Sequence, residues 1–79
     1  MSILAIKINP QAVGVMFDDS ALRLILADGR EVSAPLAWFP TLLDATEKQR
    51  GNWQLIGRGS GIHWPDLDED IAVDTLLKH

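Results

Sequence analysis

The chain has 79 residues and a formal net charge of −4. Because it contains no cysteine, a disulfide framework and a thiolate metal site are excluded, and the reducing cytoplasm is the expected location. An acidic chain disfavours a reader of duplex phosphate and favours a basic protein partner. No apolar run approaches the ~20 residues of a membrane span, and the N-terminus lacks the basic region of a signal peptide. We therefore predict one cytoplasmic domain over residues 1–79 with no membrane contact.

The first half of the chain has the two-residue periodicity that is typical of half-buried strands. Apolar residues recur at Val13, Val15 and Phe17, and the same spacing returns over residues 22–26. The pattern predicts two strands with one apolar face each. A further strand could precede them over residues 3–8.

Asp28-Gly29 indicates a hairpin between these strands and the next, and the apolar pattern selects its register. A two-residue loop would mix apolar and polar side chains on one face. A three-residue loop, Ala27-Asp28-Gly29 with the glycine in the left-handed conformation, puts Leu24 opposite Val32. Leu22 then lies opposite Ala34, and one face is apolar throughout. We predict the three-residue loop.

Two short helices are predicted in the middle of the chain. Pro40 suits the first turn of a helix, where its missing N–H does no harm, and residues 39–46 have helical apolar spacing. Thr46 and Gln49 have the spacing of a capping box, which starts a second helix that runs through Arg50. We expect a break at Thr46 rather than one long helix.

The second half predicts short extended pieces joined by turns. These are strands over residues 53–57 and 62–64, a flexible turn over residues 58–61, an extended piece near residues 71–73 and a final helical turn through Leu76 and Leu77. The predicted fold class is α+β. It consists of a small antiparallel sheet of three to five short strands, two short central helices and a C-terminal helical turn.

The segment from Ile62 to residue 70 should fold back over the sheet. Alternation places Ile62 and Trp64 on one side of the chain and His63 on the other, and Pro65 ends the strand by removing a donor. Leu67 is the apolar anchor expected to turn inward from the acidic residues around it.

The strongest chemical candidate is the acidic run Asp66-Leu-Asp68-Glu69-Asp70, which we expect to form a loop. Carboxylates at alternate positions can converge on a hard cation. An EF-hand loop that opens at Asp66 would need glycine at position 71 and glutamate at position 77, where this chain has Ile71 and Leu77. We therefore predict no metal site. A solvated loop and an acidic contact surface are the remaining interpretations.

Catalytic and cofactor motifs are not predicted. A catalytic triad could be sought in Ser60, His63 and Asp66, which are near one another in sequence, but Ser60 is not on a strand-to-helix elbow. The glycines at positions 57, 59 and 61 are better explained by a tight turn than by a phosphate-binding loop. The basic residues are too scattered for direct nucleic-acid binding. Three tryptophans, Trp38, Trp53 and Trp64, are interpreted as mainly structural, although tryptophan is also enriched at binding hot spots.

The chain resembles a prokaryotic family, domain of unknown function family 2442, from about Val13 to Leu77. The most specific match is Gly59-Ser-Gly-Ile-His63-Trp-Pro-Asp-Leu-Asp-Glu-Asp-Ile71, which looks like the family signature GIHWP-x-LDEDI. Further matches are Asp28-Gly-Arg30, Pro35-Leu-Ala-Trp-Phe-Pro40, Ala45-Thr46 and Arg50-Gly-Asn-Trp53. Thr41 departs from the family, in which arginine follows this proline; if that arginine pairs with the acidic loop in relatives, the pairing is missing here.

The resemblance implies a β-rich α+β fold similar to the N-terminal domain of some helix-turn-helix regulators. It also implies gene pairs like toxin–antitoxin modules, hence an antitoxin-like binding role. We therefore predict a non-enzymatic protein-interaction module, the antitoxin-like partner of a small basic protein, with no cofactor. The predicted partner-binding residues are His63, Trp64, Asp66, Asp68, Glu69 and Asp70.

Two other functions stay open. One is a DNA-linked regulatory domain that acts with a helix-turn-helix partner. The other is a small enzyme or metal-binding domain that uses His63 and the acidic loop. A homo-oligomer is compatible with each of the three.

Overall fold

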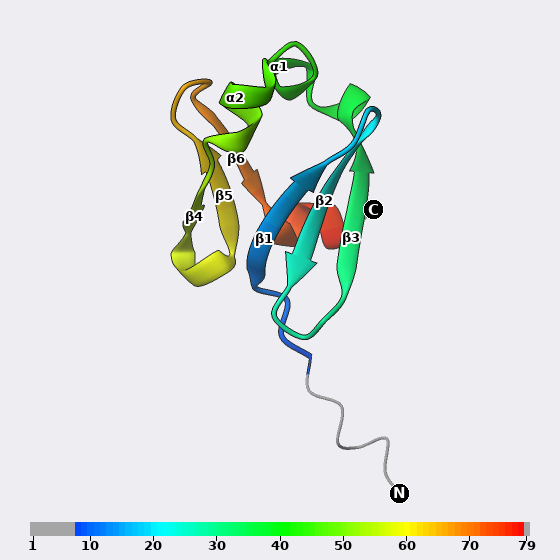
Figure 1. Cartoon of the computed structure of the whole chain (residues 1–79). Helices are drawn as coiled ribbons and strands as arrows, with labels where there is room; N and C mark the ends of the chain where they lie inside the picture. The colour runs from blue at the N-terminus through cyan, green and yellow to red at the C-terminus, as the bar shows by residue number, and fades with distance from the viewer. Residues whose placement is uncertain (1–7, 79) are drawn as a thin grey trace, which may run out of the picture.

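The computed structural model describes residues 8–78 of the chain (Figure 1). In chain order its elements are β1 (Ala12–Phe17), β2 (Ala21–Leu26), β3 (Glu31–Pro35), η2 (Leu36–Trp38), α1 (Pro40–Leu43), α2 (Glu47–Gly51), β4 (Gln54–Ile56), η3 (Gly57–Gly59), β5 (Gly61–Trp64), β6 (Glu69–Ala72) and α3 (Val73–Leu77). The strand considered over residues 3–8 lies outside the described residues, apart from the exposed Ile8.

The strands form two antiparallel sheets of three, and three short α-helices accompany them. The first sheet has the order β1-β2-β3 and the second the order β4-β5-β6. Figure 1 shows α1 and α2 at one end of the molecule, where the chain passes from the first sheet to the second. The predicted α+β class is confirmed, and the strands that we expected in one sheet divide between two.

The register of the β2–β3 hairpin is the predicted one. Leu24 pairs with Val32 and Leu22 with Ala34. Gly29 has φ of 93°, and its N–H donates to Leu26 O at 3.0 Å, as a three-residue loop with a left-handed glycine requires.

A β-bulge in β1 overturns the expected face of Val13. Ala12 pairs with Leu26 and Gly14 with Ile25, so Val13 is the extra residue. Because a bulge shifts the alternation by one position, Ala12 is buried at 2% exposure and Val13 is 56% exposed. Val15 and Phe17 pack against the core as predicted.

The carboxylate of Asp28 holds the β2–β3 turn together. It accepts hydrogen bonds from Arg30 Nε at 2.9 Å and from the Asn9 N–H at 2.9 Å, and its other oxygen accepts from the Arg30 N–H at 3.1 Å. The Arg30 guanidinium also forms an ion pair with it. The Arg30 side-chain hydrogen bond, followed by the backbone one from Asn9, lowers the pKa of Asp28 from 3.8 to about 2 against the effect of desolvation.

This pKa predicts how stability depends on acid. Because the folded pKa lies below the unfolded one, the contribution of Asp28 is present above pH 3.8 and is lost as the pH falls toward about 2. In urea titrations at neutral pH, the free energy of unfolding of wild type should exceed that of Asp28→Asn. This difference should close as the pH falls from 3.8 to about 2. A constant gap across that range would contradict the assignment.

The helices begin where the sequence predicts. Pro40 is the first residue of α1, and Thr46 forms a capping box with Gln49 at the start of α2, so the chain breaks between the helices as expected. Arg50 joins them, since its Nε donates to Leu42 O and its Nη2 to Leu43 O, both at 2.8 Å. Both carbonyls lie at the C-terminal end of α1, where Leu42 O also accepts the Ala45 N–H at 3.2 Å. Over residues 8–78, no helix has the length and apolar character to cross a membrane.

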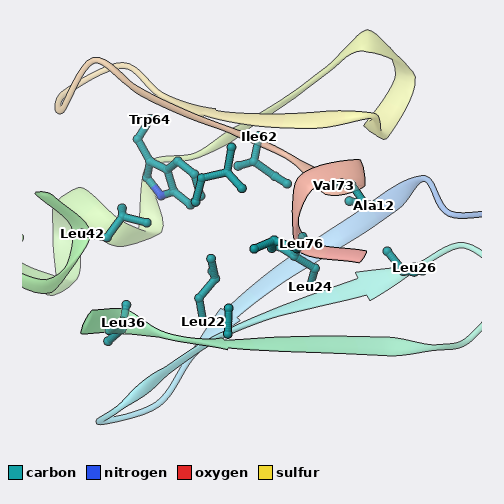
Figure 2. Packing of buried hydrophobic residues seen from close by; sticks show 12 residues of the cluster. Ala12, Leu22, Leu24, Leu26, Leu36, Leu42, Ile62, Trp64, Val73 and Leu76 are labelled. Atoms are coloured by element: carbon teal, nitrogen blue, oxygen red, sulfur yellow. The ribbon is translucent and has the colours of Figure 1, made fainter. Parts of the chain in front are cut away.

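One apolar core lies between the two sheets (Figure 2). Figure 2 shows Trp64 and Ile62 of the second sheet pointing toward Leu22 of the first. β2 and β6 add further apolar side chains, and the short helices η2, α1 and α3 contribute the remaining large ones. The buried set is Ala12, Leu22, Leu24, Leu26, Ala34, Leu36, Leu42, Ile62, Trp64, Ile71, Val73 and Leu76.

Candidate functional site

Strand β5 divides its side chains between the core and the outer face, as predicted. Ile62 and Trp64 are both fully buried, and the side chain of His63 keeps 28% exposure on the other face. β5 ends at Trp64, directly before Pro65. The alternation of an extended segment therefore places the histidine outside and the indole inside.

A four-residue turn follows and connects β5 to β6. Trp64 pairs with Glu69 across the hairpin, and the Leu67 N–H donates to Trp64 O at 3.1 Å. Leu67 is half-buried and packs against the core, which confirms its predicted inward direction. Asp68 has φ of 50°, a left-handed conformation that aspartate and asparagine tolerate better than most residues. The turn thus anchors one apolar side chain and leaves its acidic tip in water.

The acidic segment, residues 66–70, is only in part the loop that we expected. Glu69 and Asp70 belong to β6, because they pair with Trp64 and His63 of β5. Cross-strand neighbours on one face lie close enough to interact. Accordingly, His63 Nδ1–H donates to Asp70 Oδ1 across the hairpin. The strand pairing, rather than a loop, fixes this half of the segment.

The carboxylates of the acidic segment differ in their surroundings. Asp66, Asp68 and Asp70 are exposed, and Glu69 is half-buried. Asp66 accepts a hydrogen bond from Asn52 Nδ2 at 2.9 Å. The side-chain carboxylates of Asp68 and Glu69 form no hydrogen bond or ion pair with any of the residues 8–78. Two carboxylates are therefore held in place, and the two between them are available to a ligand.

The geometry brings together only part of a catalytic or metal-binding set. The hydrogen-bond partner of His63 is Asp70, and the hydrogen-bond partner of Asp66 is Asn52. Within the described part of the chain, no group of three or more His, Asp or Glu side chains is placed to hold a metal ion. Ser60 lies beyond η3, and its carbonyl accepts the Val73 N–H at 2.9 Å, which ties β5 to the last helix.

The three tryptophans have different environments. Trp64 is fully buried, its Nε1–H donates to Arg50 O at 3.0 Å, and its ring meets Phe17 edge-on with centroids 6.3 Å apart. Trp53 is half-buried against the core, and Trp38 is 53% exposed. The prediction that Trp64 contacts a partner is wrong, because a side chain without exposed surface can only support the hairpin from below.

Sequence reasoning missed two residues that shape this region. Asn52 donates a hydrogen bond to the Asp66 carboxylate. The carbonyl oxygen of Arg50 accepts the hydrogen bond from the Trp64 indole N–H, and the Arg50 guanidinium carbon lies 5.6 Å from the centroid of the Phe17 ring. Both lie fourteen positions from their hairpin partners. No local pattern predicts contacts at this separation, and only the tertiary fold brings the residues together.

Two surface hollows are lined by residues outside the acidic segment. One of about 380 Å³ is lined by Trp38, Phe39, Thr75 and Leu76, between η2 and α3. Another of about 250 Å³ is lined by Phe17, Asp18, Asp19, Glu47, Arg50 and Gly51.

Comparison with known proteins assigns the family. A family model described as "Protein of unknown function (DUF2442)" matches residues 12–79. The chain belongs to the DUF2442 family. No curated protein matches the chain.

The fold of this DUF2442 protein also occurs in a solved structure. It is similar to the crystal structure of a protein of unknown function from Rhodospirillum rubrum, with a TM-score of 0.73 and 24% sequence identity. The similarity covers 86% of this chain and 84% of the other. At this identity the comparison supports the arrangement of strands and helices.

Proposed function

We propose that this DUF2442 protein is a non-enzymatic interaction module that binds a small basic protein through its acidic segment. The observation that carries the proposal is the presence of two carboxylates, Asp68 and Glu69, that have no partner within residues 8–78 and lie between two that are held. Carboxylates that keep their water when free can exchange it for lysine or arginine groups of a partner.

Electrostatics support a basic partner. The chain carries a net charge of −4, and four of its eleven acidic residues lie within residues 66–70. Opposed charges on two proteins raise the association rate and disfavour wrong partners. Asn52 and His63 reduce the freedom of Asp66 and Asp70 before binding, which lowers the entropy that association costs.

An antitoxin-like role is the finer form of the proposal. It rests on the gene pairing that the family resemblance implies, and a short acidic chain suits the neutralising member of such a pair. Action in the cytoplasm belongs to the same proposal, since the chain contains no cysteine and depends on no disulfide.

The test compares two double variants with equal change of charge. Asp68→Asn with Glu69→Gln removes the carboxylates without partners, and Glu31→Gln with Asp44→Asn removes two charges elsewhere that likewise lack partners among the described residues. Wild type should recover a small basic protein from the source cell, with affinity that falls as salt rises. The acidic-segment variant should weaken binding, mainly through a slower association rate, by at least about tenfold.

The control variant should bind nearly as wild type does, because it changes net charge by the same amount away from the acidic segment. Equal weakening by both double variants would mean that only overall charge matters. Recovery of no basic protein by wild type at low salt would also refute the proposal.

A further inference from the structure

Strand β6 is the last strand of the second sheet, so only one of its edges has a strand beside it. The Val73 N–H donates to Ser60 O at 2.9 Å, which makes Ser60 and Val73 a hydrogen-bonded pair that continues the register of β5 and β6. Hydrogen-bonded and non-hydrogen-bonded pairs alternate in an antiparallel ladder. The pairs that Asp70 and Ala72 form with β5 are therefore non-hydrogen-bonded, and the backbone polar groups of these two residues point away from β5.

Three of these outward backbone groups have no partner among the described residues. The N–H and C=O of Asp70 and the N–H of Ala72 form no hydrogen bond within residues 8–78, and both residues are exposed. The Ala72 C=O belongs to α3 instead, because Ala72 is the N-cap whose carbonyl accepts the first bond of that helix. Unpaired N–H and C=O groups along a strand edge are a template for an added strand.

The charge of β6 selects the kind of strand that can pair with it. Glu69 and Asp70 are two of its four residues, and Asp68 directly precedes them. A second copy of this chain would bring the same carboxylates to this edge, and like charges opposite each other destabilise a sheet. Opposite charges on neighbouring strands stabilise it. The edge is therefore matched to a segment that carries lysine or arginine.

We propose that the basic partner binds along β6 as an extended segment, which adds a fourth, antiparallel strand to the second sheet. This inference rests on the proposed function and states how the partner meets the acidic segment. In recognition by strand addition, main-chain hydrogen bonds contribute affinity and alternate side chains contribute specificity. Here the main-chain bonds are those to the free groups of Asp70 and Ala72.

The two faces of β6 define the side chains that the added strand needs. Asp70 lies on the outer face beside His63, and only its Oδ1 is held by that residue. Glu69 and Ile71 lie on the inner face, where Glu69 is half-buried and Ile71 is buried. Cross-strand neighbours on one face interact directly. An antiparallel segment should therefore have an apolar residue opposite Ile71, followed by two basic residues opposite Asp70 and Glu69.

A nuclear magnetic resonance titration of the full, isotope-labelled chain with the end-capped peptide Thr-Thr-Val-Lys-Lys-Thr-Thr tests the proposal. The amide signals of Asp70 and Ala72 should shift more than those of other residues in the second sheet. Their hydrogen exchange should slow as the bound fraction rises, because both N–H groups become hydrogen-bonded. The charge-reversed peptide Thr-Thr-Val-Glu-Glu-Thr-Thr should produce neither change.

Ala72→Pro removes one of the free N–H groups without a change in charge. The φ of −86° at Ala72 is close to that of proline, and this N–H makes no bond to β5 that could be lost, so the variant should fold, which circular dichroism checks. Loss of the bond leaves a carbonyl of the peptide without a partner and should raise the peptide Kd by at least about tenfold.

The matched control is Ser33→Pro on the edge of the first sheet. Leu26 N–H donates to Arg30 O, so the same alternation directs the N–H of Ser33 away from β2, and Ser33 is exposed. Pro35 already occupies the same orientation two residues further along β3. Ser33→Pro should leave the peptide Kd unchanged.

Equal Kd values for Ala72→Pro and Ser33→Pro overturn strand addition. So do Asp70 and Ala72 amides that neither shift nor slow, and a wild type that does not bind the lysine peptide at low salt. The proposed function survives each of these results if a basic protein from the cell still requires Asp68 and Glu69, since side chains alone would then form the contact. Conversely, a Kd that rises in Ala72→Pro and not in Asp68→Asn with Glu69→Gln supports strand addition and refutes the charge-based function.

Discussion

Trp64→Ala should destabilise the protein by about 3–5 kcal/mol, a large part of the stability of so small a domain. The indole is fully buried between the two sheets, and a cavity on that scale cannot be closed by small shifts of its neighbours. The variant also removes the donor for Arg50 O and the edge-on contact with Phe17. Urea unfolding followed by far-ultraviolet circular dichroism measures the loss without relying on tryptophan fluorescence.

Two variants show which part of the tryptophan matters. Trp64→Phe keeps a ring in the cavity but removes the indole N–H, so we expect an intermediate loss. Asp68→Asn, in the same hairpin, should cost less than about 1 kcal/mol, because asparagine accepts the left-handed conformation at this exposed tip. The reverse order, with Trp64→Ala harmless and Asp68→Asn unfolding the chain, would make the acidic segment a structural element and remove it as a contact surface.

The parts of the fold that follow from local chemistry were predictable from the sequence. Pro40, the Thr46 capping box and the loop at Gly29 each satisfy or restrict backbone groups within four residues, so the sequence pattern contains the whole interaction. The inward direction of Trp64 and outward direction of His63 follow in the same way from alternation along one strand.

Features that depend on distant partners were not predictable. Alternation shows which face of a strand is apolar but not which strand lies beside it, so the division into two sheets is absent from the pattern. The bulge at Val13 accompanies the packing of Ala12 in the core, which depends on the rest of the fold. Glu69 is in a strand, despite the low strand preference of acidic residues, because it pairs with Trp64 across the hairpin. The same holds for the candidate site, where the acidic residues are evident in sequence and Asn52, which holds one of them, is not.

The candidate site depends on the core directly beneath it. Trp64 and Ile71 fill the inner face of the hairpin whose outer face and tip carry His63, Asp70 and Asp68. A strand cannot move one face without the other, so the packing of the indole sets the position of the carboxylates. This hairpin therefore combines buried apolar anchors with several exposed charges.

Gly59→Ala should be the most destabilising change in the turn that leads into β5. Gly59 has φ of 91°, which costs an alanine about 1–2 kcal/mol. A methyl group at this position would also lie 2.5 Å from the carbonyl oxygen of Ala12, in β1 of the other sheet. Because the obstacle is backbone rather than a flexible side chain, η3 or β1 must shift, and overpacking of this kind adds about 1–3 kcal/mol.

Two other glycines separate the conformational cost from the steric one. Gly29 has φ of 93° but nothing within 4 Å of an added methyl group, so Gly29→Ala should show the conformational part alone. Gly51, at the end of α2, has no positive φ and no neighbour within 4 Å, and Gly51→Ala should be neutral or stabilising by up to about 1 kcal/mol. Urea unfolding of the three variants should rank the losses as Gly59, then Gly29, then Gly51. Equal losses at Gly59 and Gly29 would show that β1 and η3 are not in close contact, and the way the first sheet meets the second would have to be redrawn.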